Sequence, residues 1–297
     1  MPILVESVPE LRQVVAGWRR QDHSIGLVPT MGSLHAGHLS LVESALADNQ
    51  RVVVSIFVNP LQFGPTEDYH RYPRPLRQDL DLLGELGADL VVFHPSLDEM
   101  YPQPPKTSIA VGDLGRVLEG LTRPGHFDGV ATVVTKLLNL AGPDRAYFGQ
   151  KDAQQLAIVR QLVRDLDLGV EIIGCPIVRD LDGLALSSRN GYLSPVDRAG
   201  ATALFRGLVA ANQAHAYGGQ VDTELARVRI LEILGAEPHL EVDYVELVDP
   251  DTLLGVGRLA LVAARLNGVR LIDNHIIGHP LVAGIGPSRL TTSWTHP

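Results

Sequence analysis

In the first 175 residues of the chain, short apolar runs alternate with longer segments of helical periodicity, and this alternation constrains the fold most. Crossover helices between parallel strands produce such a pattern, so we predict an α/β fold with a Rossmann-like parallel sheet. The predicted strands are Ile25–Val28, Val52–Val58, Leu90–Phe93, Ala146–Phe148 and Val170–Ile173, and the predicted helices are His38–Asp48, Leu76–Leu86, Phe127–Leu140 and Ala153–Asp165.

The pattern changes after Arg189, where two helical segments precede three strand-like runs. This order predicts a smaller α+β unit at the carboxyl end. Pro176, Gly183 and Pro195 interrupt the chain between the two patterns and place a domain boundary there. We expect an N-terminal domain at 1–178, a C-terminal lid domain at 179–285 and a flexible tail at 286–297. The expected C-terminal helices are Pro195–Tyr217 and Val221–Leu234, and the expected strands are Glu241–Val248, Leu259–Ala264 and Val269–Ile272.

Composition limits the partners and the compartment. The chain has 25 basic and 34 acidic residues, so its net charge is −9, which disfavours a nucleic acid partner. The single cysteine, Cys175, cannot form an intrachain disulfide, so we expect a reducing compartment, the cytoplasm. We expect the Cys175 thiol to pack in the core without a chemical role. The longest strongly apolar stretch, Val52–Val58, is far shorter than the roughly 20 residues of a membrane helix, so we expect no membrane partner.

Two histidines stand three residues apart after the first predicted strand, in Pro29-Thr30-Met31-Gly32-Ser33-Leu34-His35-Ala36-Gly37-His38. The start of a helix offers unpaired N–H groups to an anion, and positions i and i+3 share one helix face. Both imidazoles can therefore stabilise negative charge at phosphorus. An ordinary histidine pair at a helix start is the alternative, whereas zinc normally needs at least three protein ligands. The pattern resembles the His-x-Gly-His element of the nucleotidyltransferase superfamily.

The segment Phe57–Asp68 follows the next predicted strand and carries Asn59 and Gln62. An amide both donates and accepts hydrogen bonds, so Gln62 suits a substrate that bears hydroxyl and carboxylate groups. Asn-Pro also commonly starts a turn, and that structural role for Asn59 remains open.

The predicted strand Ala146–Phe148 ends in Gly149-Gln150-Lys151-Asp152. Lys151 supplies a compact cation for a phosphate, and Gln155 lies one helical turn further on the same face. A surface lysine at a helix that Asp152 caps is the alternative. Since the carboxyl ends of parallel strands meet at one edge, we expect His35, His38, Asn59, Gln62 and Lys151 to share a site.

Two further polar segments have weaker signals. Ser187-Ser188-Arg189 at the domain boundary can follow a triphosphate when a lid closes, although such a loop is also an ordinary solvated connection. In Leu118–Phe127, Arg123 suits subunit contacts or loop order and not direct catalysis. We expect the same of Glu119 and His126.

Taken together, these motifs resemble the pantoate–beta-alanine ligase family over most of the chain. The departures are small, namely Asp180 where the family has Glu and an extended C-terminal tail. The segments that carry the resemblance are Pro29–His38, Phe57–Asp68, Arg123–Phe127, Phe148–Gln155, Leu186–Asn190 and Arg270–Asn274.

The resemblance implies ATP-dependent condensation of (R)-pantoate with beta-alanine to pantothenate, through pantoyl adenylate, with release of AMP and pyrophosphate. It also implies Mg2+, although its protein ligands stay unidentified, and a homodimer. Gln62 and Gln155 would bind pantoate, and Gln62 also beta-alanine. His38, His35, Lys151 and Arg189 would be catalytic. The implied ATP-binding residues are Met31, Gly32, Ser33, Leu34, His35, Ala36, Gly37, His38, Gly149, Gln150, Lys151, Asp152, Val178, Leu186, Ser187, Ser188 and Arg189.

Three other interpretations remain. The His-x-Gly-His element would equally support nucleotidyl transfer onto a phosphate-bearing acceptor. A non-enzymatic nucleotide-binding or dehydrogenase-like module is suggested by Gly255–Ala260, but this segment is a weak match because no βαβ unit supports it. His275 and His279 are spaced like a metal pair but lack a third ligand, so we interpret them as structural.

Overall fold

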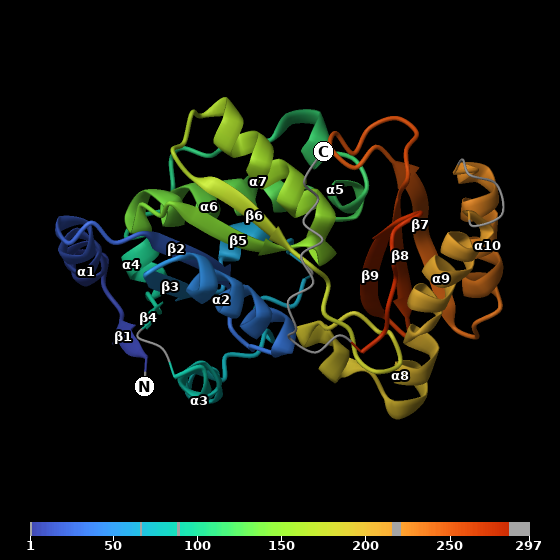
Figure 1. Cartoon of the computed structure of the whole chain (residues 1–297), viewed down its shortest axis with the longest axis horizontal. Coiled ribbons are helices and arrows are strands. Elements are labelled where there is room, and N and C mark those ends of the chain that lie inside the picture. The colour runs from blue at the N-terminus through green and yellow to red at the C-terminus, as the bar shows by residue number, and fades with distance from the viewer. Residues whose placement is uncertain (1, 66, 88–89, 216–220, 285–297) are drawn as a thin grey trace. The chain divides into compact units, whose positions relative to one another are not determined.

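The computed structural model describes residues 2–65, 67–87, 90–215 and 221–284. These residues form two compact units, the first made of 2–150 with 154–175 and the second of 151–153 with 176–284 (Figure 1). The predicted domain boundary after residue 178 stays a prediction. The predicted tail at 286–297 lies outside the described residues.

A six-stranded sheet forms the centre of the first unit, in the order β1-β4-β3-β2-β5-β6, with every pair parallel. The chain builds outward from β2 in one direction through β3 and β4 and then in the other through β5 and β6. The strand order therefore reverses between β2 and β5, and ligands of such sheets bind beside this reversal. The strands are β1 Ile3–Val5, β2 Ile25–Thr30, β3 Arg51–Ile56, β4 Leu90–Phe93, β5 Arg145–Gly149 and β6 Glu171–Cys175.

Helices cover both faces of this sheet. On one face, Leu27 and Val53 pack with residues of α1, α6 and α7, including Leu11, Val130 and Leu156. The alternate strand residues, such as Val28 and Val54, pack on the other face with α2 and α3. The helices and 3-10 turns of this unit are α1 Val8–Arg20, α2 Ala36–Asp48, η1 Pro60–Gln62, α3 Leu76–Glu85, α4 Leu97–Met100, η2 Gly112–Gly115, α5 Glu119–Thr122, α6 His126–Ala141, η3 Gln150–Asp152 and α7 Ala153–Asp165.

The second unit carries a three-stranded antiparallel sheet in the order β7-β8-β9. Asn267 and Gly268 have φ of 46° and 84° and join β8 to β9 in a two-residue turn, the usual connection of a tight hairpin. Leu204 and Leu208 of α9 pack with Ile230 of α10 and Val262 of β8. The elements are η4 Ser188–Tyr192, α8 Pro195–Ala201, α9 Ala203–His215, α10 Thr223–Gly235, β7 Leu240–Val248, β8 Leu259–Leu266 and β9 Val269–Ile276.

The predicted fold class, a Rossmann-like parallel sheet with a smaller α+β unit, is confirmed. One predicted helix, Pro195–Tyr217, is wrong as a single element, because α8 ends at Ala201 and α9 starts at Ala203. Its last two residues lie outside the described ranges. No helix in those ranges combines the length and the apolarity that crossing a bilayer requires.

Candidate active site

The two histidines lie at the amino end of α2, directly after the central strand β2. His35 is the N-cap of α2, and its Nδ1 accepts a hydrogen bond from the backbone N–H of Gly37 at 3.1 Å. An Nδ1 that accepts carries no proton, so the neutral His35 ring presents its Nε2–H as a donor. The rings of His35 and His38 lie 4.1 Å apart between centroids, as positions i and i+3 of one helix face allow.

The turn between β2 and α2 is held by a buried carboxylate of α3. Asp79 accepts from the backbone N–H of Ser33 at 2.9 Å and of Leu34 at 2.7 Å. Burial raises the pKa of Asp79, against the two amide hydrogen bonds that favour its charged form. No role was predicted for Asp79, because the acid lies within a predicted amphipathic helix that is distant in sequence from the turn.

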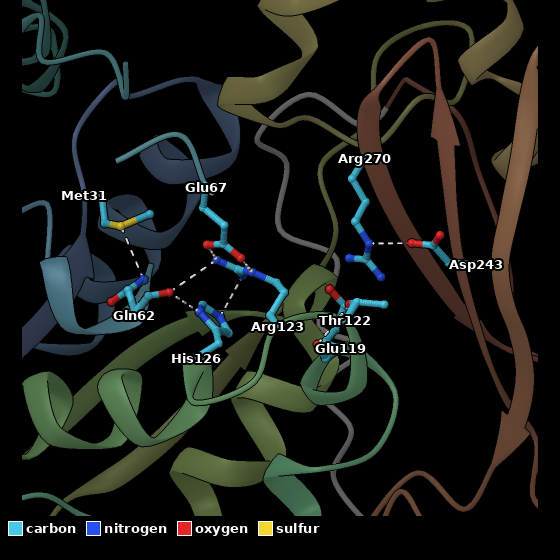
Figure 2. Close-up of polar contacts among 9 residues, drawn as sticks. All are labelled: Met31, Gln62, Glu67, Glu119, Thr122, Arg123, His126, Asp243 and Arg270. Atoms are coloured by element: carbon cyan, nitrogen blue, oxygen red, sulfur yellow. Dashed lines mark hydrogen bonds and ion pairs between the residues drawn. The ribbon is translucent and has the colours of Figure 1, made fainter. Parts of the chain in front are cut away.

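Gln62 connects the amide segment to the histidine segment. It ends η1, just after β3, and its Nε2 donates to Sδ of Met31 at 3.3 Å (Figure 2). Strand pairing explains this proximity, since Thr30 of β2 is opposite Ile56 of β3. Met31 and Gln62, both predicted as site residues, thus lie in contact.

Asn59 has the structural role that its Asn-Pro sequence also allowed. It is fully buried, and its Oδ1 accepts from the Leu61 N–H at 3.3 Å and from the Tyr101 hydroxyl at 3.0 Å. Its Nδ2 donates to Oε1 of Gln62 and to the Gly129 carbonyl, each at 3.1 Å. Asn59 therefore orients the Gln62 amide while having its own polar atoms bonded within the protein.

Helix α6 packs directly onto this turn through Gly129. A Cβ at Gly129 would lie 2.2 Å from the Leu61 carbonyl oxygen and 2.7 Å from the Gln62 nitrogen, distances that backbone atoms cannot accommodate. Glycine at this position is therefore required for the close approach of α6 to the residues that carry Gln62.

Arg123, His126 and Glu67 form a second support for Gln62 (Figure 2). Arg123 makes a two-pronged ion pair with Glu67, with both N–O distances 2.7 Å. His126 lies 2.9 Å from a guanidinium nitrogen of Arg123 through Nε2 and 2.7 Å from the Gln62 carbonyl oxygen through Nδ1. A carbonyl only accepts and a guanidinium only donates, so His126 carries its proton on Nδ1.

Electrostatics maintain these protonation states. Burial, with the charge of Arg123, lowers the pKa of His126 to about 4, so the ring is neutral near pH 7. Burial opposes ionisation of Glu67, but the hydrogen bonds and charge of Arg123 outweigh it and lower the pKa of that carboxyl. Of the two roles considered for Arg123, this geometry supports loop order.

The Lys151 segment follows β5 as the 3-10 turn η3. The Gln150 side chain donates to the Gly174 carbonyl of β6 at 3.3 Å, so it joins two strand ends. Lys151 belongs to the second unit, where its carbonyl accepts from Nδ2 of Asn274 at 2.9 Å. No role was predicted for Asn274 itself.

A buried ion pair supports Asn274. Arg179 and Asp273 have side chains only 3% and 2% exposed, and they bond at 2.5 and 2.8 Å. The second guanidinium nitrogen also donates to the Asn274 carbonyl at 3.3 Å, and the Asp273 carboxylate accepts from the Asn274 N–H at 2.7 Å. The backbone of Asn274 is thus held on both sides.

Two adjacent glutamines of α7 differ in their surroundings. Gln154 is buried, accepts from the Glu119 N–H at 3.0 Å and donates to the carbonyls of Leu114 and Val117 at 2.7 and 2.9 Å. Gln155, predicted to bind pantoate, is half-buried. Gln154 therefore orders the loop before α5.

Val178 and Leu186 are paired in the second unit, because the Leu186 N–H donates to the Val178 carbonyl at 3.0 Å. Ser187 is the N-cap of η4, and its Oγ accepts from the Arg189 N–H at 3.3 Å. Residues predicted for ATP binding are thus divided: the first unit contains Met31, Gly32, Ser33, Leu34, His35, Ala36, Gly37, His38, Gly149 and Gln150, and the second contains Lys151, Asp152, Val178, Leu186, Ser187, Ser188 and Arg189.

Comparison with protein-family models matches residues 3–276 to pantoate-beta-alanine ligase. The chain belongs to the pantoate-beta-alanine ligase family. It is similar to the pantothenate synthetase of Aquifex aeolicus, with 49% identity over 279 residues that cover 92% of this chain and 98% of the relative.

Two solved structures agree with this membership. That of pantothenate synthetase from Thermus thermophilus matches with a TM-score of 0.87 and 49% identity, over 93% of this chain and 99% of that one. That of pantoate-beta-alanine ligase from Francisella tularensis, complexed with beta-gamma ATP and beta-alanine, matches with a TM-score of 0.79 and 34% identity, over 97% and 100%. The predicted pantoate-beta-alanine ligase family and its ATP-dependent condensation are confirmed.

The fold also tests two other predicted patterns, the glycine pattern at Gly255–Ala260 and the histidine pair His275 and His279. Gly255–Ala260 leads into strand β8 of an antiparallel sheet, whereas a dinucleotide fingerprint needs a helix after its glycines. The Nε2 of His275 lies 3.1 Å from the His279 carbonyl, and burial lowers the pKa of His275 to about 4. His275 thus has a structural partner.

Proposed function

We propose that the chain condenses pantoate with beta-alanine in two steps through an acyl adenylate. A carboxylate oxygen of (R)-pantoate attacks the α-phosphorus of ATP, pyrophosphate leaves, and pantoyl adenylate remains. The amine of beta-alanine then attacks the acyl carbon, loses a proton and displaces AMP, which gives pantothenate. The pair of adjacent imidazoles at the amino end of α2, in contact range of the Gln62 segment through Met31, carries this proposal.

Neither step needs a covalent nucleophile from the protein, because positioning and charge stabilisation suffice for this chemistry. Cys175 does not supply one: it is buried, and burial raises the pKa of its thiol to about 11. The absence of an activated thiol at Cys175 fits direct attack of one substrate on the other.

His35 and His38 act on the phosphates in this proposal. His35 donates from Nε2, since its Nδ1 is occupied by the Gly37 N–H, and His38 is the catalytic histidine that stabilises the charge developing at the α-phosphorus. A single donor of this kind contributes about 3 kcal/mol to the transition state.

The remaining substrate contacts follow the family pattern. Gln62 and Gln155 bind pantoate, and Gln62 also contacts beta-alanine. Lys151, Ser187 and Arg189 contact the phosphates, with Gly149–Asp152, Val178 and Leu186 completing the ATP site. Among the described residues, no group of three or more histidine, cysteine or acidic side chains is placed to hold a metal ion. We assign Mg2+ to the ATP phosphates, a mode that magnesium commonly uses.

We propose that the chain is located in the cytoplasm and forms a homodimer. The family resemblance supports the homodimer. The single buried Cys175 is consistent with a reducing compartment.

The test separates the two half-reactions. Purified protein is incubated with ATP, Mg2+ and pantoate while ATP–pyrophosphate exchange is measured, and beta-alanine is added in a second reaction while AMP is measured. We expect exchange that requires pantoate and AMP release that requires beta-alanine. A product that retains the nucleotide would support nucleotidyl transfer instead and overturn the ligase proposal.

Two variants test the residue assignments in this assay. His38→Ala should keep the wild-type melting temperature, and its exchange rate should fall about 100- to 1000-fold. His70→Ala, at an exposed position, should keep both the melting temperature and the exchange rate of wild type. Gln62→Ala should raise KM for pantoate and beta-alanine more than KM for ATP, with the exposed Gln78→Ala as its control. Near-parental exchange in His38→Ala, or equal KM changes in Gln62→Ala, would contradict these roles.

A further inference from the structure

We propose that Asp79 is a positioning residue for adenylate formation: it fixes the turn at Gly32–Leu34 so that His35 and His38 face the reacting phosphate. This inference rests on the proposed function and concerns a residue of α3 that no motif suggested. It also implies that the amides of Ser33 and Leu34 serve the protein itself and not the nucleotide.

Both oxygens of Asp79 are used in this contact. Oδ2 accepts from the Ser33 N–H at 2.9 Å and Oδ1 from the Leu34 N–H at 2.7 Å, and the Asp79 residue is 1% exposed. Hydrogen bonds to an ionised acceptor are stronger than neutral ones. A buried carboxylate that is bonded to two consecutive amides therefore holds those amides in one orientation.

The backbone conformation of the turn requires such a support. Gly32 has φ of 79° and Ser33 has φ of 52°, so two consecutive residues adopt the left-handed region, which is unfavourable for serine. Consecutive N–H groups in turns of this kind converge on an anion, and here the anion is the Asp79 carboxylate. The nearest anion-binding position of the turn is thus already occupied from within the protein.

The packing around Gly32 leaves no room for a side chain at this position. A Cβ at Gly32 would lie 2.9 Å from Oδ2 of Asp79 and 3.0 Å from Cγ2 of Ile56. The Gly32 N–H in turn donates to Oγ1 of Thr30 at 3.2 Å. The turn is therefore fixed on the strand side by Thr30 and on the helix side by Asp79.

The consequence for catalysis follows from sequence order. Leu34 immediately precedes His35, the N-cap whose Nδ1 bonds to Gly37. A displacement of the turn moves both imidazoles together, and a misplacement of about 1 Å at a reacting group costs on the order of 100-fold in rate. ATP must then meet Ser33 and Leu34 through atoms other than their N–H groups.

The test compares Asp79→Asn with Asp81→Asn, a carboxylate on the same helix that is 55% exposed and paired with Arg77. Asparagine keeps the shape of Asp79 but turns one acceptor into an NH2 group that faces an N–H. The first half-reaction is followed by pantoate-dependent ATP–pyrophosphate exchange. The second is followed by AMP release after isolated enzyme-bound pantoyl adenylate is mixed with beta-alanine.

Asp79→Asn should slow exchange about 10- to 100-fold and raise KM for ATP, while AMP release from the bound adenylate stays within about twofold. Asp81→Asn should leave both within about twofold. A purely structural role would reduce the active fraction and slow both half-reactions equally, and that result would overturn the inference, as would an unchanged exchange rate.

Gly32→Ala perturbs the same turn in a second way, because its methyl group would push against the Asp79 carboxylate and Cγ2 of Ile56 and because alanine is strained at a φ of 79°. It should slow exchange selectively, and the double variant should be no slower than the slower single variant, since both act through one turn. Additive losses would overturn the inference. Wild-type protein without pantoate-dependent exchange would instead overturn the proposed function, and the Asp79 inference with it.

Discussion

Acid should destabilise the first unit through His126. This ring is buried, its pKa is lowered from 6.5 to about 4, and Arg123 donates to the Nε2 that would receive a second proton. Protonation of the folded state would put an imidazolium against a guanidinium. In the unfolded chain the same ring takes up a proton at its ordinary pKa.

The difference between the folded and unfolded pKa of His126 sets the direction and the size of the change in the free energy of unfolding. Between pH 6.5 and about 4 the unfolded state binds a proton that the folded state does not, so the free energy of unfolding falls as the pH falls through that window. The difference between an ordinary histidine pKa of 6.5 and a pKa of about 4 corresponds to about 3 kcal/mol in full, of which about 2 kcal/mol is lost between pH 6.5 and about pH 4.5.

Urea unfolding over this pH range measures the effect. Trp18 packs against the core of the first unit and reports its unfolding in a Trp294→Phe background. His126→Asn retains a donor for the Gln62 carbonyl but cannot take up the proton, so its stability should fall by about 2 kcal/mol less than that of wild type. The exposed His70→Asn should behave as wild type. Equal pH dependence in wild type and His126→Asn would show that His126 does not cause the loss of stability in acid.

Three further predictions concern supports of the site. Arg179→Met leaves Asp273 as an unpaired buried charge and should destabilise the second unit by about 3–5 kcal/mol in thermal unfolding, while Arg179→Met with Asp273→Leu should recover most of that loss. Gly129→Ala forces α6 away from the Leu61 carbonyl and should raise KM for pantoate, whereas Gly169→Ala, which has open space around it, should not. Asn274→Ala removes the donor to the Lys151 carbonyl and should raise KM for ATP more than KM for beta-alanine, and equal changes would argue against a role in placing Lys151.

The central strands could be predicted because they are buried on both faces. Val52, Val53 and Val54 have no exposed surface, and Leu90–Phe93 likewise, so the sequence shows unbroken apolar runs there. β1 was missed for the opposite reason. It has three residues, of which Ile3 and Leu4 are 55% and 40% exposed, and it is identified only by its pairing with β4.

The predicted site residues depend on local patterns, and the missed ones depend on long-range contacts. His35 and His38 could be found because glycines, a strand and a helix start surround them within a few residues. Asp79 accepts hydrogen bonds from amides that lie 45 and 46 residues earlier in the chain. The periodicity of a helix or strand gives no information about contacts at such a separation. Gln154 and Gln155 are adjacent and chemically identical, so the sequence alone does not show that Gln154 is buried and Gln155 only half-buried.

The position of β1 affects how the chain folds during synthesis. Val5 lies opposite Phe93, so the first strand has no partner until about 90 further residues have left the ribosome, which takes on the order of 5–20 s. During that interval β2 and β3, which are neighbours both in the chain and in the sheet, can already pair. Strand β1 is thus the last to join its side of the sheet although it precedes β2, β3 and β4 in the chain.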